Sequence, residues 1–463
     1  MVLIKSISGI RGTIGGREGT NLTPPDVVKF STGFGRWVRD NSSSTKIVIG
    51  RDARISGEII SKLVSSTLQS VGFDVIDLGL STTPTVEMAV VAEKAGGGII
   101  LTASHNPMEW NALKLLNQKG EFVSATDGEQ ILNYGEKQDQ AFAPIDKIGS
   151  YQNADGYIDW HIDQILMLPE VEVDTIRKSN FKVVVDAVNS TGGIAVPALL
   201  KRFGIEEITC LNCEPNGQFD HNPEPLPENL SAISKTIKAG KYDLGIVVDP
   251  DVDRLVLICE DGSFFGEEYT LVAVADYILA KNKGSAVSNL SSTRALKDVC
   301  NRYGVDYQAS AVGEVNVVEK MKQIGAVIGG EGNGGIIYPG LHYGRDALVG
   351  IALFLSHLAK SGKKMTELKN QYPQYHISKN KLELTSGTDV DDLLLKVKDK
   401  YSQHEINNTD GLKVDFEDGW IHLRKSNTEP IIRVISESHD KASAEKLSAE
   451  MISEIQAIIS KIA

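Results

Sequence analysis

The chain is poor in cysteine, with only four thiols among 463 residues. Cys210 and Cys213 are separated by two residues, as in half of a zinc site, but no second cysteine pair completes such a site. Cys259 and Cys300 stand alone in the sequence. The pattern therefore favours buried free thiols, and so few cysteines suit the reducing cytoplasm.

Long apolar stretches are also absent. No apolar run approaches the length that crosses a membrane, and residues 1–6 lack the apolar core of a signal peptide. Apolar residues make up 41% of the chain and charged residues 24%, which is typical of a globular protein. We therefore expect a cytoplasmic protein without a membrane partner.

Basic residues are fewer than acidic ones: the chain has 48 Lys and Arg and 61 Asp and Glu, which gives a net charge of −13. This acidic balance argues against a nucleic-acid partner. It does not exclude an anionic small substrate, since a few cations can gather in one pocket of an acidic protein. The length exceeds what a single hydrophobic core usually supports and predicts two to four domains.

One pattern recurs three times in the first 370 residues: an apolar strand, a helix and a second strand. The three copies are expected at residues 46–78, 182–211 and 285–307. A helix that links two neighbouring strands in this way places them in parallel. The pattern therefore predicts three α/β units of similar topology.

Each unit contains a later apolar strand that runs into a polar loop. These loops begin near Ser104, Asp249 and Glu331. Open α/β sheets bind ligands beyond the carboxyl ends of their strands. Three such units facing one cleft would bring the three loops together.

The pattern changes after residue 370, where hairpin-like segments and a closing helix at 442–462 are typical of an α+β domain. This region contains the loop Arg424-Lys425-Ser426-Asn427-Thr428-Glu429-Pro430, with Arg433 just beyond it. Two guanidiniums and two hydroxyls suit a phosphate dianion, although a solvated turn remains an alternative. We expect domains at 1–150, 151–258, 259–370 and 371–463.

The second loop offers a metal site. Asp249, Asp251 and Asp253 alternate, so their carboxylates turn to one side of an extended loop and suit a hard dication such as Mg²⁺. A calcium EF-hand is excluded, because Arg254 stands at the sixth position, where that loop needs glycine. An aspartyl-phosphate hydrolase with Asp249 as its nucleophile stays open, but it leaves Ser104 and the basic loop without roles.

Five segments together carry a resemblance. They are Ser8-Gly9-Ile10-Arg11-Gly12, the loop Thr102-Ala103-Ser104-His105-Asn106-Pro107, the Asp-x-Asp-x-Asp-Arg run at 249–254, the Gly-Glu loop at 330–334, and Arg-x-Ser-Asn-Thr-Glu-Pro at 424–430. In this order, and over nearly the whole chain, the sequence resembles the α-D-phosphohexomutase family. The resemblance implies a mutase of the isomerase class that interconverts hexose 6-phosphate and hexose 1-phosphate through phosphoserine and a hexose 1,6-bisphosphate. It also implies four domains around a central cleft, the first three alike in topology and each built on a mixed sheet, and the last an α+β domain.

The resemblance gives each motif a role. Ser104 would carry the phosphoryl group, and Asp249, Asp251 and Asp253 would hold Mg²⁺ together with a phosphoserine oxygen. The reacting phosphoryl group would be lined by Arg11, His105, Lys114 and Arg254. The sugar hydroxyls and the far phosphate would be bound by Glu331, Asn333, Arg424, Ser426, Asn427, Thr428 and Arg433.

The identity of the sugar depends on Asn333, which stands where bacterial relatives more often have serine. Its amide oxygen could accept a hydrogen bond from a C2 ammonium, which favours a glucosamine phosphate and phosphoglucosamine mutase activity. Phosphomannomutase/phosphoglucomutase activity is the alternative. A sugar-phosphate binding protein without catalysis is a more distant one, because simple binding needs neither Ser104 nor three aspartates. The sequence gives no signal for the oligomeric state.

Overall fold

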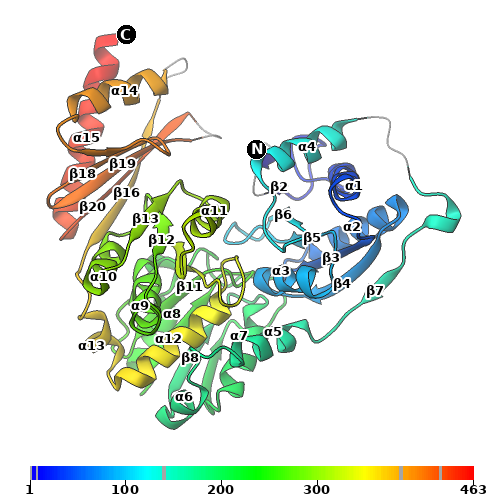
Figure 1. Cartoon of the computed structure of the whole chain (residues 1–463), viewed down its shortest axis with the longest axis horizontal. Coiled ribbons are helices and arrows are strands. Elements are labelled where there is room, and N and C mark those ends of the chain that lie inside the picture. The colour runs from blue at the N-terminus through cyan, green and yellow to red at the C-terminus, as the bar shows by residue number, and fades with distance from the viewer. Residues whose placement is uncertain (1–2, 7–8, 138–141, 385–388, 427–429, 463) are drawn as a thin grey trace.

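The computed structural model describes residues 3–6, 9–137, 142–384, 389–426 and 430–462. These residues form four units, each with a sheet of its own (Figure 1). The N-terminal unit lies at one end, the second and third units lie together, and the C-terminal unit lies above the third. Within the described residues, no helix is long and apolar enough to cross a membrane.

The N-terminal unit is a seven-stranded mixed sheet in the order β1-β2-β6-β5-β3-β4-β7. Its strands are β1 (Ile4–Ser6), β2 (Gly9–Thr13), β3 (Lys46–Arg51), β4 (Asp74–Leu80), β5 (Gly97–Leu101), β6 (Trp110–Asn117) and β7 (Tyr151–Asn153). Its helices are α1 (Pro24–Asn41), α2 (Gly57–Val71), α3 (Thr83–Ala92), α4 (Ala125–Glu136) and the 3₁₀ turn η1 (Ile145–Lys147). We expect the first domain to end at residue 150. Strand β7 lies just beyond that residue but pairs with β4, so it belongs to the N-terminal sheet.

The second unit has the sheet order β11-β10-β8-β9, and the third has β13-β12-β14-β15. The second contains α5 (Tyr157–Leu166), α6 (Val173–Ser179), β8 (Lys182–Asp186), α7 (Gly192–Arg202), β9 (Glu207–Leu211), η2 (Pro227–Asn229), α8 (Ser231–Ala239), β10 (Leu244–Val248) and β11 (Leu255–Cys259). The third contains α9 (Glu267–Lys281), β12 (Ala286–Asn289), α10 (Ala295–Tyr303), β13 (Tyr307–Ser310), α11 (Glu314–Ile324), β14 (Ile328–Glu331), β15 (Gly335–Ile337), α12 (Ala347–Ser361) and α13 (Met365–Lys369). One continuous apolar core joins the two units.

The predicted repeat is present in all three α/β units. Strands β3 and β4, β8 and β9, and β12 and β13 are parallel pairs. The last parallel strand of each unit then turns into an antiparallel neighbour, which gives the pairs β5–β6, β10–β11 and β14–β15. Each predicted polar loop is the connection inside such a pair, so the same topology places all three loops at equivalent sheet ends.

The C-terminal unit is an antiparallel sheet in the order β16-β20-β19-β18-β17 with its own apolar core. Its elements are β16 (His376–Glu383), α14 (Val390–Lys400), β17 (Glu405–Asn407), β18 (Leu412–Phe416), β19 (Gly419–Lys425), β20 (Ile431–Ser438) and α15 (Lys441–Ile462). It contacts the third unit: its Asp410 side chain accepts a hydrogen bond from the backbone N–H of Val312, in the third unit, at 2.9 Å. These sheets confirm the predicted fold class of three α/β units followed by an α+β unit.

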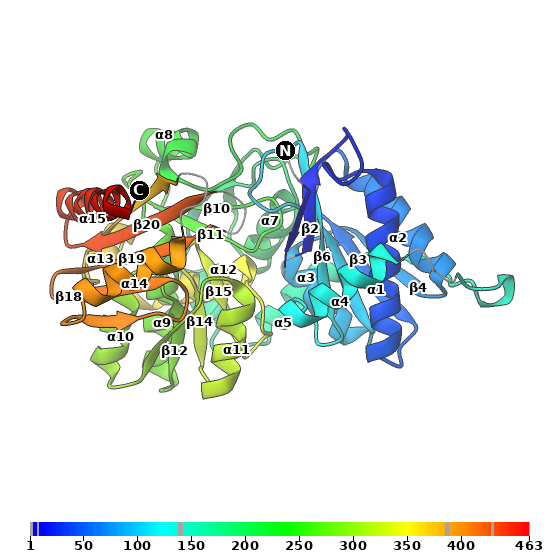
Figure 2. The same cartoon turned by 90° about the horizontal axis from the view of Figure 1, so that it is seen from above.

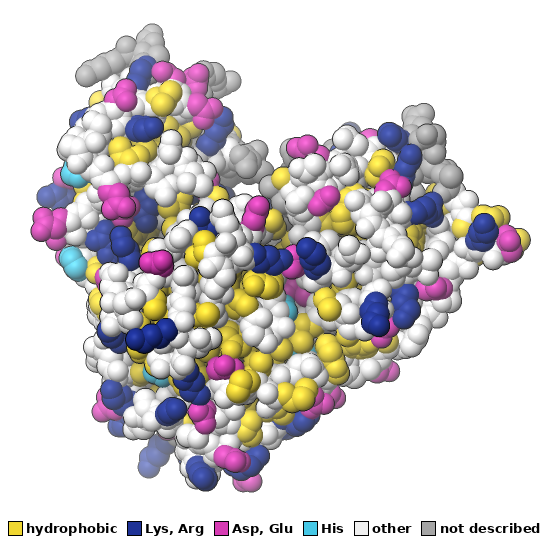
Figure 3. Space-filling model, viewed as in Figure 1, with side chains coloured by type: hydrophobic (Ala, Val, Ile, Leu, Met, Phe, Trp, Pro, Cys, Tyr) yellow, Lys and Arg dark blue, Asp and Glu magenta, His cyan; other side chains and the backbone are white. Residues whose placement is uncertain are grey.

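A notch separates the N-terminal and C-terminal units. The surface is hollowed between them (Figure 3). Viewed from above, α1 and α2 lie toward one end of the molecule and α15 and β18 at the other (Figure 2). The second and third units lie between these ends, so loops from all four units can face one cleft.

Candidate active site

Ser104 lies where the first and second units meet. Its backbone is in the left-handed region, with φ at 47°, and its N–H donates to Oγ1 of Thr102 at 2.9 Å. This bend turns the side chain toward the second unit, and Oγ donates to Oδ2 of Asp249 at 2.7 Å. The serine and aspartate loops predicted from the sequence therefore meet directly.

The three loop aspartates converge at this point. Asp249, Asp251 and Asp253 are fully buried, and one oxygen of each lies within 4.8 Å of the others. The bend that gathers them is at Val252, whose φ is 62°. Oδ1 of Asp249 accepts from the backbone N–H groups of Asp253 and Arg254, both at 3.1 Å.

This aspartate cluster fits a divalent cation. Oδ1 of Asp251 and Oδ1 of Asp253 are buried and accept no hydrogen bond from any described residue. A buried carboxylate oxygen without a donor is costly unless a cation faces it. Burial raises the pKa of Asp249 well above its usual range, and the charges of Asp253 and Asp251 add to this rise. A hard dication would relieve that repulsion.

Lys114 lies against the same aspartates. From β6 its Nζ donates to Oδ2 of Asp251 at 2.7 Å and lies 3.5 Å from Oδ2 of Asp253. Burial lowers the pKa of Lys114, but the two carboxylates outweigh it and leave the pKa above its usual value. Oγ1 of Thr83, at the start of α3, donates to the same Asp251 oxygen at 2.6 Å.

The other three side chains predicted to line the reacting phosphoryl group also lie near Ser104 and the aspartates. Arg11 on β2 donates to Oδ1 of Asn106 at 3.4 Å. Nδ1 of His105 lies 3.5 Å from Oγ of Ser104. Burial, aided by the charge of Arg254, lowers the pKa of His105 to about 2, so its ring is neutral. Nε of Arg254 is 4.0 Å from Asp253, too long for a hydrogen bond.

The predicted sugar residues lie on the third unit. Glu331, at the end of β14, accepts from Asn289 at 2.9 Å, from the N–H of Gly313 at 3.0 Å and from Arg345 at 2.8 Å. A carboxylate offers about four acceptor positions, so one remains for a ligand. Oδ1 of Asn333 accepts from the N–H of Gly335 at 3.2 Å.

The C-terminal loop connects β19 and β20. Asn427 and Thr428 lie outside the described residues. Nε of Arg424 is 2.8 Å from Asp410, and Ser426 is half-buried. Burial lowers the pKa of Arg11, and the charge of Arg433 lowers it further. The positive charge of Arg433, on the C-terminal unit, therefore acts on the guanidinium of Arg11, on the N-terminal unit across the notch.

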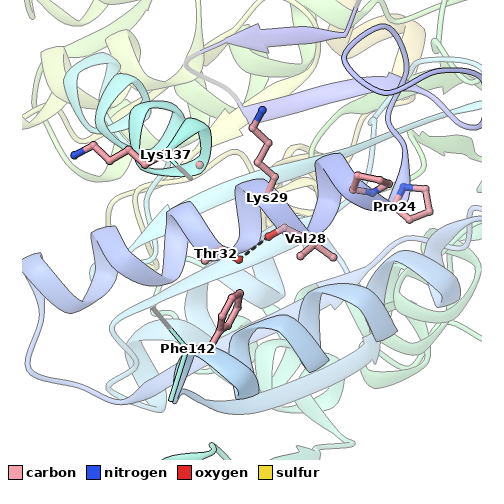
Figure 4. Close-up of a pocket in the computed structure, with 8 residues that line it drawn as sticks. Pro24, Val28, Lys29, Thr32, Lys137 and Phe142 are labelled. Atoms are coloured by element: carbon pink, nitrogen blue, oxygen red, sulfur yellow. Dashed lines mark hydrogen bonds between the residues drawn. The ribbon is translucent and has the colours of Figure 1, made fainter. Parts of the chain in front are cut away.

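A separate pocket of about 520 Å³ lies beside α1 (Figure 4). Pro24, Val28 and Phe142 are among the residues that line it, and no residue of the site above does so. The hydroxyl of Thr32 in this pocket donates to the backbone oxygen of Val28 at 2.8 Å. Lys29 and Lys137 are the charged residues among those that line it, and no carboxylate or histidine joins them, so we place the chemistry at the loops.

Family comparisons agree with this geometry. The phosphoglucomutase/phosphomannomutase alpha/beta/alpha domains I, II and III match residues 4–142, 158–262 and 266–375, and the C-terminal domain of that family matches 383–454. The chain belongs to this family. The predicted phosphohexomutase class, an isomerase that transfers a phosphoryl group within the sugar, is thereby confirmed.

Individual members of the family are similar over nearly the whole chain. A phosphoglucomutase/phosphomannomutase of Thermococcus kodakarensis is 35% identical over 440 residues, which cover 94% of this chain and 95% of that one. A probable phosphoglucosamine mutase of Methanopyrus kandleri is 30% identical over 458 residues, with 98% of both chains covered. A crystal structure of a family member from Burkholderia thailandensis superposes with a TM-score of 0.84 at 25% identity and covers 99% of this chain and 98% of that chain.

This phosphohexomutase holds its serine loop with a residue that the sequence analysis missed. The guanidinium of Arg54 is buried and donates to the backbone oxygens of three loop residues, Ser104, Asn106 and Pro107, and of Trp110, the first residue of β6. Asp52 pairs with it at 3.0 Å. Because these bonds go to backbone oxygens, replacing the side chain of Ser104 leaves them in place.

Arg345 is a second missed residue, and it connects the metal loop to the sugar loop. Its guanidinium donates to Asp253 at 2.7 Å, to Glu331 at 2.8 Å and to Glu314 at 3.0 Å. A Cβ on Gly335 would come within 2.3 Å of the Arg345 side chain, so glycine makes room for it. The signal was weak in the sequence, because Arg345 stands alone outside the five motifs.

Replacing Arg345 by Met is expected to lower the free energy of unfolding by about 3–5 kcal/mol, because it strips the cation from buried carboxylates. Arg345→Lys keeps the charge but reaches fewer oxygens, so we expect a smaller loss of stability with a higher KM for the sugar phosphate. Urea unfolding and steady-state kinetics measure the two effects. Equal stability of the Met variant and the wild type would contradict the proposed bridging role.

Proposed function

We propose that Ser104 carries the phosphoryl group that this mutase exchanges with a hexose phosphate. The contact of Ser104 Oγ with Asp249 at 2.7 Å is the observation that best supports this role. In the first transfer the P–O bond to the serine breaks, and a P–O bond forms to the free O1 or O6 hydroxyl of the sugar; in the second, a P–O bond to the sugar breaks and the bond to the serine forms again. The hexose 1,6-bisphosphate then returns its other phosphate to Ser104, and it also serves as the activator that phosphorylates a free serine.

In this proposal Asp249, Asp251 and Asp253 hold Mg²⁺ together with an oxygen of phosphorylated Ser104. When bound, the ion neutralises the charge of the transferring phosphoryl group. The donor set supports this choice, because it contains only carboxylate oxygens and two of them are buried without donors.

Residues of the chain supply the remaining positive charge. Lys114 lies against the aspartates, and Arg11, Arg254 and neutral His105 surround Ser104 in the proposal. Fixed cations in a buried site stabilise the charge that develops as the phosphoryl group moves. We also propose a cytoplasmic location, since the proposed substrates are phosphorylated metabolites.

The basic loop of the C-terminal unit is proposed to bind the phosphate that does not react. Arg424, Ser426, Asn427, Thr428 and Arg433 would form this site, and the charge of Arg433 acts on Arg11 of the N-terminal unit. A substrate bound in either orientation presents a phosphate at that end. One phosphate site therefore serves both half-reactions.

Arg424→Ala is expected to weaken binding of every hexose phosphate by roughly 1.5–3 kcal/mol, the value of hydrogen bonds to a charged group. The loss should be the same for each sugar, because the loop is proposed to contact phosphate alone. Binding titrations with several hexose phosphates measure it, with the exposed Lys425→Ala on the same strand as control. A changed preference between sugars at unchanged phosphate affinity would rule out this assignment.

For the sugar we propose glucosamine phosphate, with mannose or glucose phosphate as the alternative. Two carboxyl groups outside the metal cluster, Glu314 and Glu331, face the single guanidinium of Arg345 at the sugar end. This excess of acid favours a substrate with an ammonium at C2. Phosphoglucosamine mutases among the relatives support the same choice.

A comparison of kcat/KM tests the sugar. We expect glucosamine 6-phosphate to exceed mannose 1-phosphate and glucose 1-phosphate by at least about tenfold, or roughly 1.4 kcal/mol. Substitution Glu331→Gln should narrow that margin, because it removes a negative charge near the ring. A tenfold preference for either neutral sugar would overturn the glucosamine proposal and leave the mutase class unchanged.

A further inference from the structure

A second cluster of metal-ligand side chains lies behind the active site, where the three α/β units meet. It consists of His161 from α5, and His342 and Asp346 from the segment that leads into α12. We call these three residues the junction cluster. His161 and Asp346 are fully buried, and the side chain of His342 is 12% exposed.

The junction cluster points three ligand atoms at one place. Nε2 of His161 lies 3.0 Å from Oδ2 of Asp346, and Nε2 of His342 lies 3.4 Å from the same oxygen. All three atoms lie within 4.8 Å of one another. Ligands on a tetrahedral zinc ion at bond lengths of about 2.0–2.1 Å stand at comparable separations. Oδ1 of Asp346 is engaged elsewhere, since it accepts from the N–H groups at the start of α12.

The outward nitrogen of each histidine already has a partner on α3. Nδ1 of His161 is 2.9 Å from Oγ1 of Thr85, and Nδ1 of His342 is 3.4 Å from Oε2 of Glu87. Metal-bound histidines almost always donate their second N–H to a hydroxyl, carbonyl or carboxylate of this kind, which fixes the ring and its tautomer. Both Nε2 atoms are thereby left to face Asp346.

Charge supports a cation at the same point. Asp346 places a carboxylate in the interior, where a dication held by the two imidazoles would balance it. Glu87 is also buried, and its Oε2 lies 3.4 Å from Nδ1 of His342, on the side of the ring away from Asp346.

We propose that the junction cluster binds one Zn²⁺ ion through Nε2 of His161, Nε2 of His342 and Oδ2 of Asp346. Water takes the fourth position, on the side where His342 is partly exposed. Two imidazoles and one carboxylate suit zinc, whereas Mg²⁺ prefers oxygen ligands alone. The site is therefore chemically distinct from the three aspartates of the active site.

Such an ion would fix the position of the catalytic loops from behind. Asp346 directly follows Arg345, which holds Asp253 and Glu331. Helix α3 carries Thr85 against His161 and also Thr83 against Asp251. The zinc ion would then be a structural link among the three α/β units and would not touch the substrate.

Metal titration of the full-length protein tests the site. After chelator treatment, the protein is loaded with excess Mg²⁺ to occupy the aspartates and is then titrated with Zn²⁺ against a chromophoric chelator. We expect one zinc equivalent, and Co²⁺ in its place should give the visible bands of a tetrahedral complex. An anomalous difference map from zinc-loaded crystals should show a peak among His161, His342 and Asp346.

Variants connect the ion to these residues. His161→Gln and His342→Gln should each weaken zinc binding by more than about 100-fold, because an amide is a poor zinc ligand. Glu87→Gln should weaken it about 10–100-fold, the usual effect of losing a partner behind a ligand. His357→Gln is the matched control, because His357 is largely buried beside Asp276 and Tyr372 but lies outside the cluster.

Zinc should also raise the melting temperature of the wild type and of His357→Gln, and leave that of His161→Gln unchanged. If the magnesium-loaded wild type takes up no zinc, or if both cluster variants bind it as tightly as the wild type, the proposal fails. The anomalous map and the Co²⁺ spectrum need only the wild type, so they decide the matter even where a variant does not fold.

Discussion

Ser104→Ala is expected to abolish mutase turnover, with a fall in kcat on the order of 10⁶-fold, comparable to removing the nucleophile of a serine hydrolase. The substitution deletes the oxygen that would accept and return the phosphoryl group, and nothing else in the loop can replace it. The fold should be retained, because Arg54 holds the loop through backbone oxygens. Steady-state kinetics and thermal unfolding measure the two quantities.

Ser70→Ala is the matched control for this prediction. Ser70 is an exposed serine on α2, and its hydroxyl donates only to the backbone oxygen of Ser66. This control should keep full turnover and, after incubation with hexose 1,6-bisphosphate, should gain one phosphate at Ser104 by mass spectrometry. Ser104→Ala should gain none.

The same experiment separates the phosphoserine from an aspartyl phosphate. Asp249 is the rival nucleophile, and its acyl phosphate would be cleaved by hydroxylamine, whereas a phosphoserine would survive. In the structure Oδ1 of Asp249 accepts two backbone N–H groups and Oδ2 accepts the serine hydroxyl. Near wild-type turnover by Ser104→Ala, or a hydroxylamine-labile adduct, would exclude Ser104 as the carrier.

The sequence could predict the fold because each α/β unit repeats one local pattern. Alternating elements at 46–78, 182–211 and 285–307 are set by short-range periodicity, and their parallel pairing follows from the handed crossover. Mixed sheets were part of the predicted fold class, but the position of the antiparallel strand that closes each loop was not predicted. It depends on which strand edge is free in the folded unit, and a local pattern does not record that.

The contact of Ser104 with Asp249 could also be anticipated, because equivalent strand ends in three similar units face one cleft. Arg345 and Arg54 could not be found in this way. Each is a single arginine outside a motif, and its partners come from distant segments of the chain. The packing of the units decides which carboxylates and carbonyl oxygens such a side chain meets.

The junction cluster shows the same limit of sequence reasoning. His161 and Asp346 are 185 positions apart, so no spacing rule relates them, and a lone histidine on a helix is usually a packed core residue. In contrast, Cys210 and Cys213 have a spacing that draws attention. Cys210 is exposed and Cys213 partly buried, and burial raises the pKa of the Cys213 thiol. Both are free thiols, as the sequence analysis expects, but the expectation that they are buried is wrong for Cys210.

Asp251→Asn is expected to weaken Mg²⁺ binding by more than about 100-fold. Loss of a residue that only hydrogen-bonds to a metal ligand typically weakens metal binding about 10–100-fold, and Asp251 is proposed as a ligand itself. One of three anionic oxygens facing the ion becomes neutral, while the side chain keeps its shape. The same change leaves buried Lys114 short of a partner, although Asp253 stays 3.5 Å away. We therefore expect a loss of unfolding free energy toward the lower end of about 3–5 kcal/mol.

A double variant separates these two effects of Asp251. Adding Lys114→Met removes the buried cation that Asp251→Asn leaves short of charge, so the double variant should regain most of the stability. It should not regain Mg²⁺ affinity, because the lost ligand is not restored. Magnesium titrations of activity and of melting temperature follow the metal, and urea unfolding follows the ion pair. Wild-type activity that is the same in EDTA as in added Mg²⁺ would show that the aspartate cluster holds no catalytic metal, and the stability loss of Asp251→Asn would then belong to Lys114 alone.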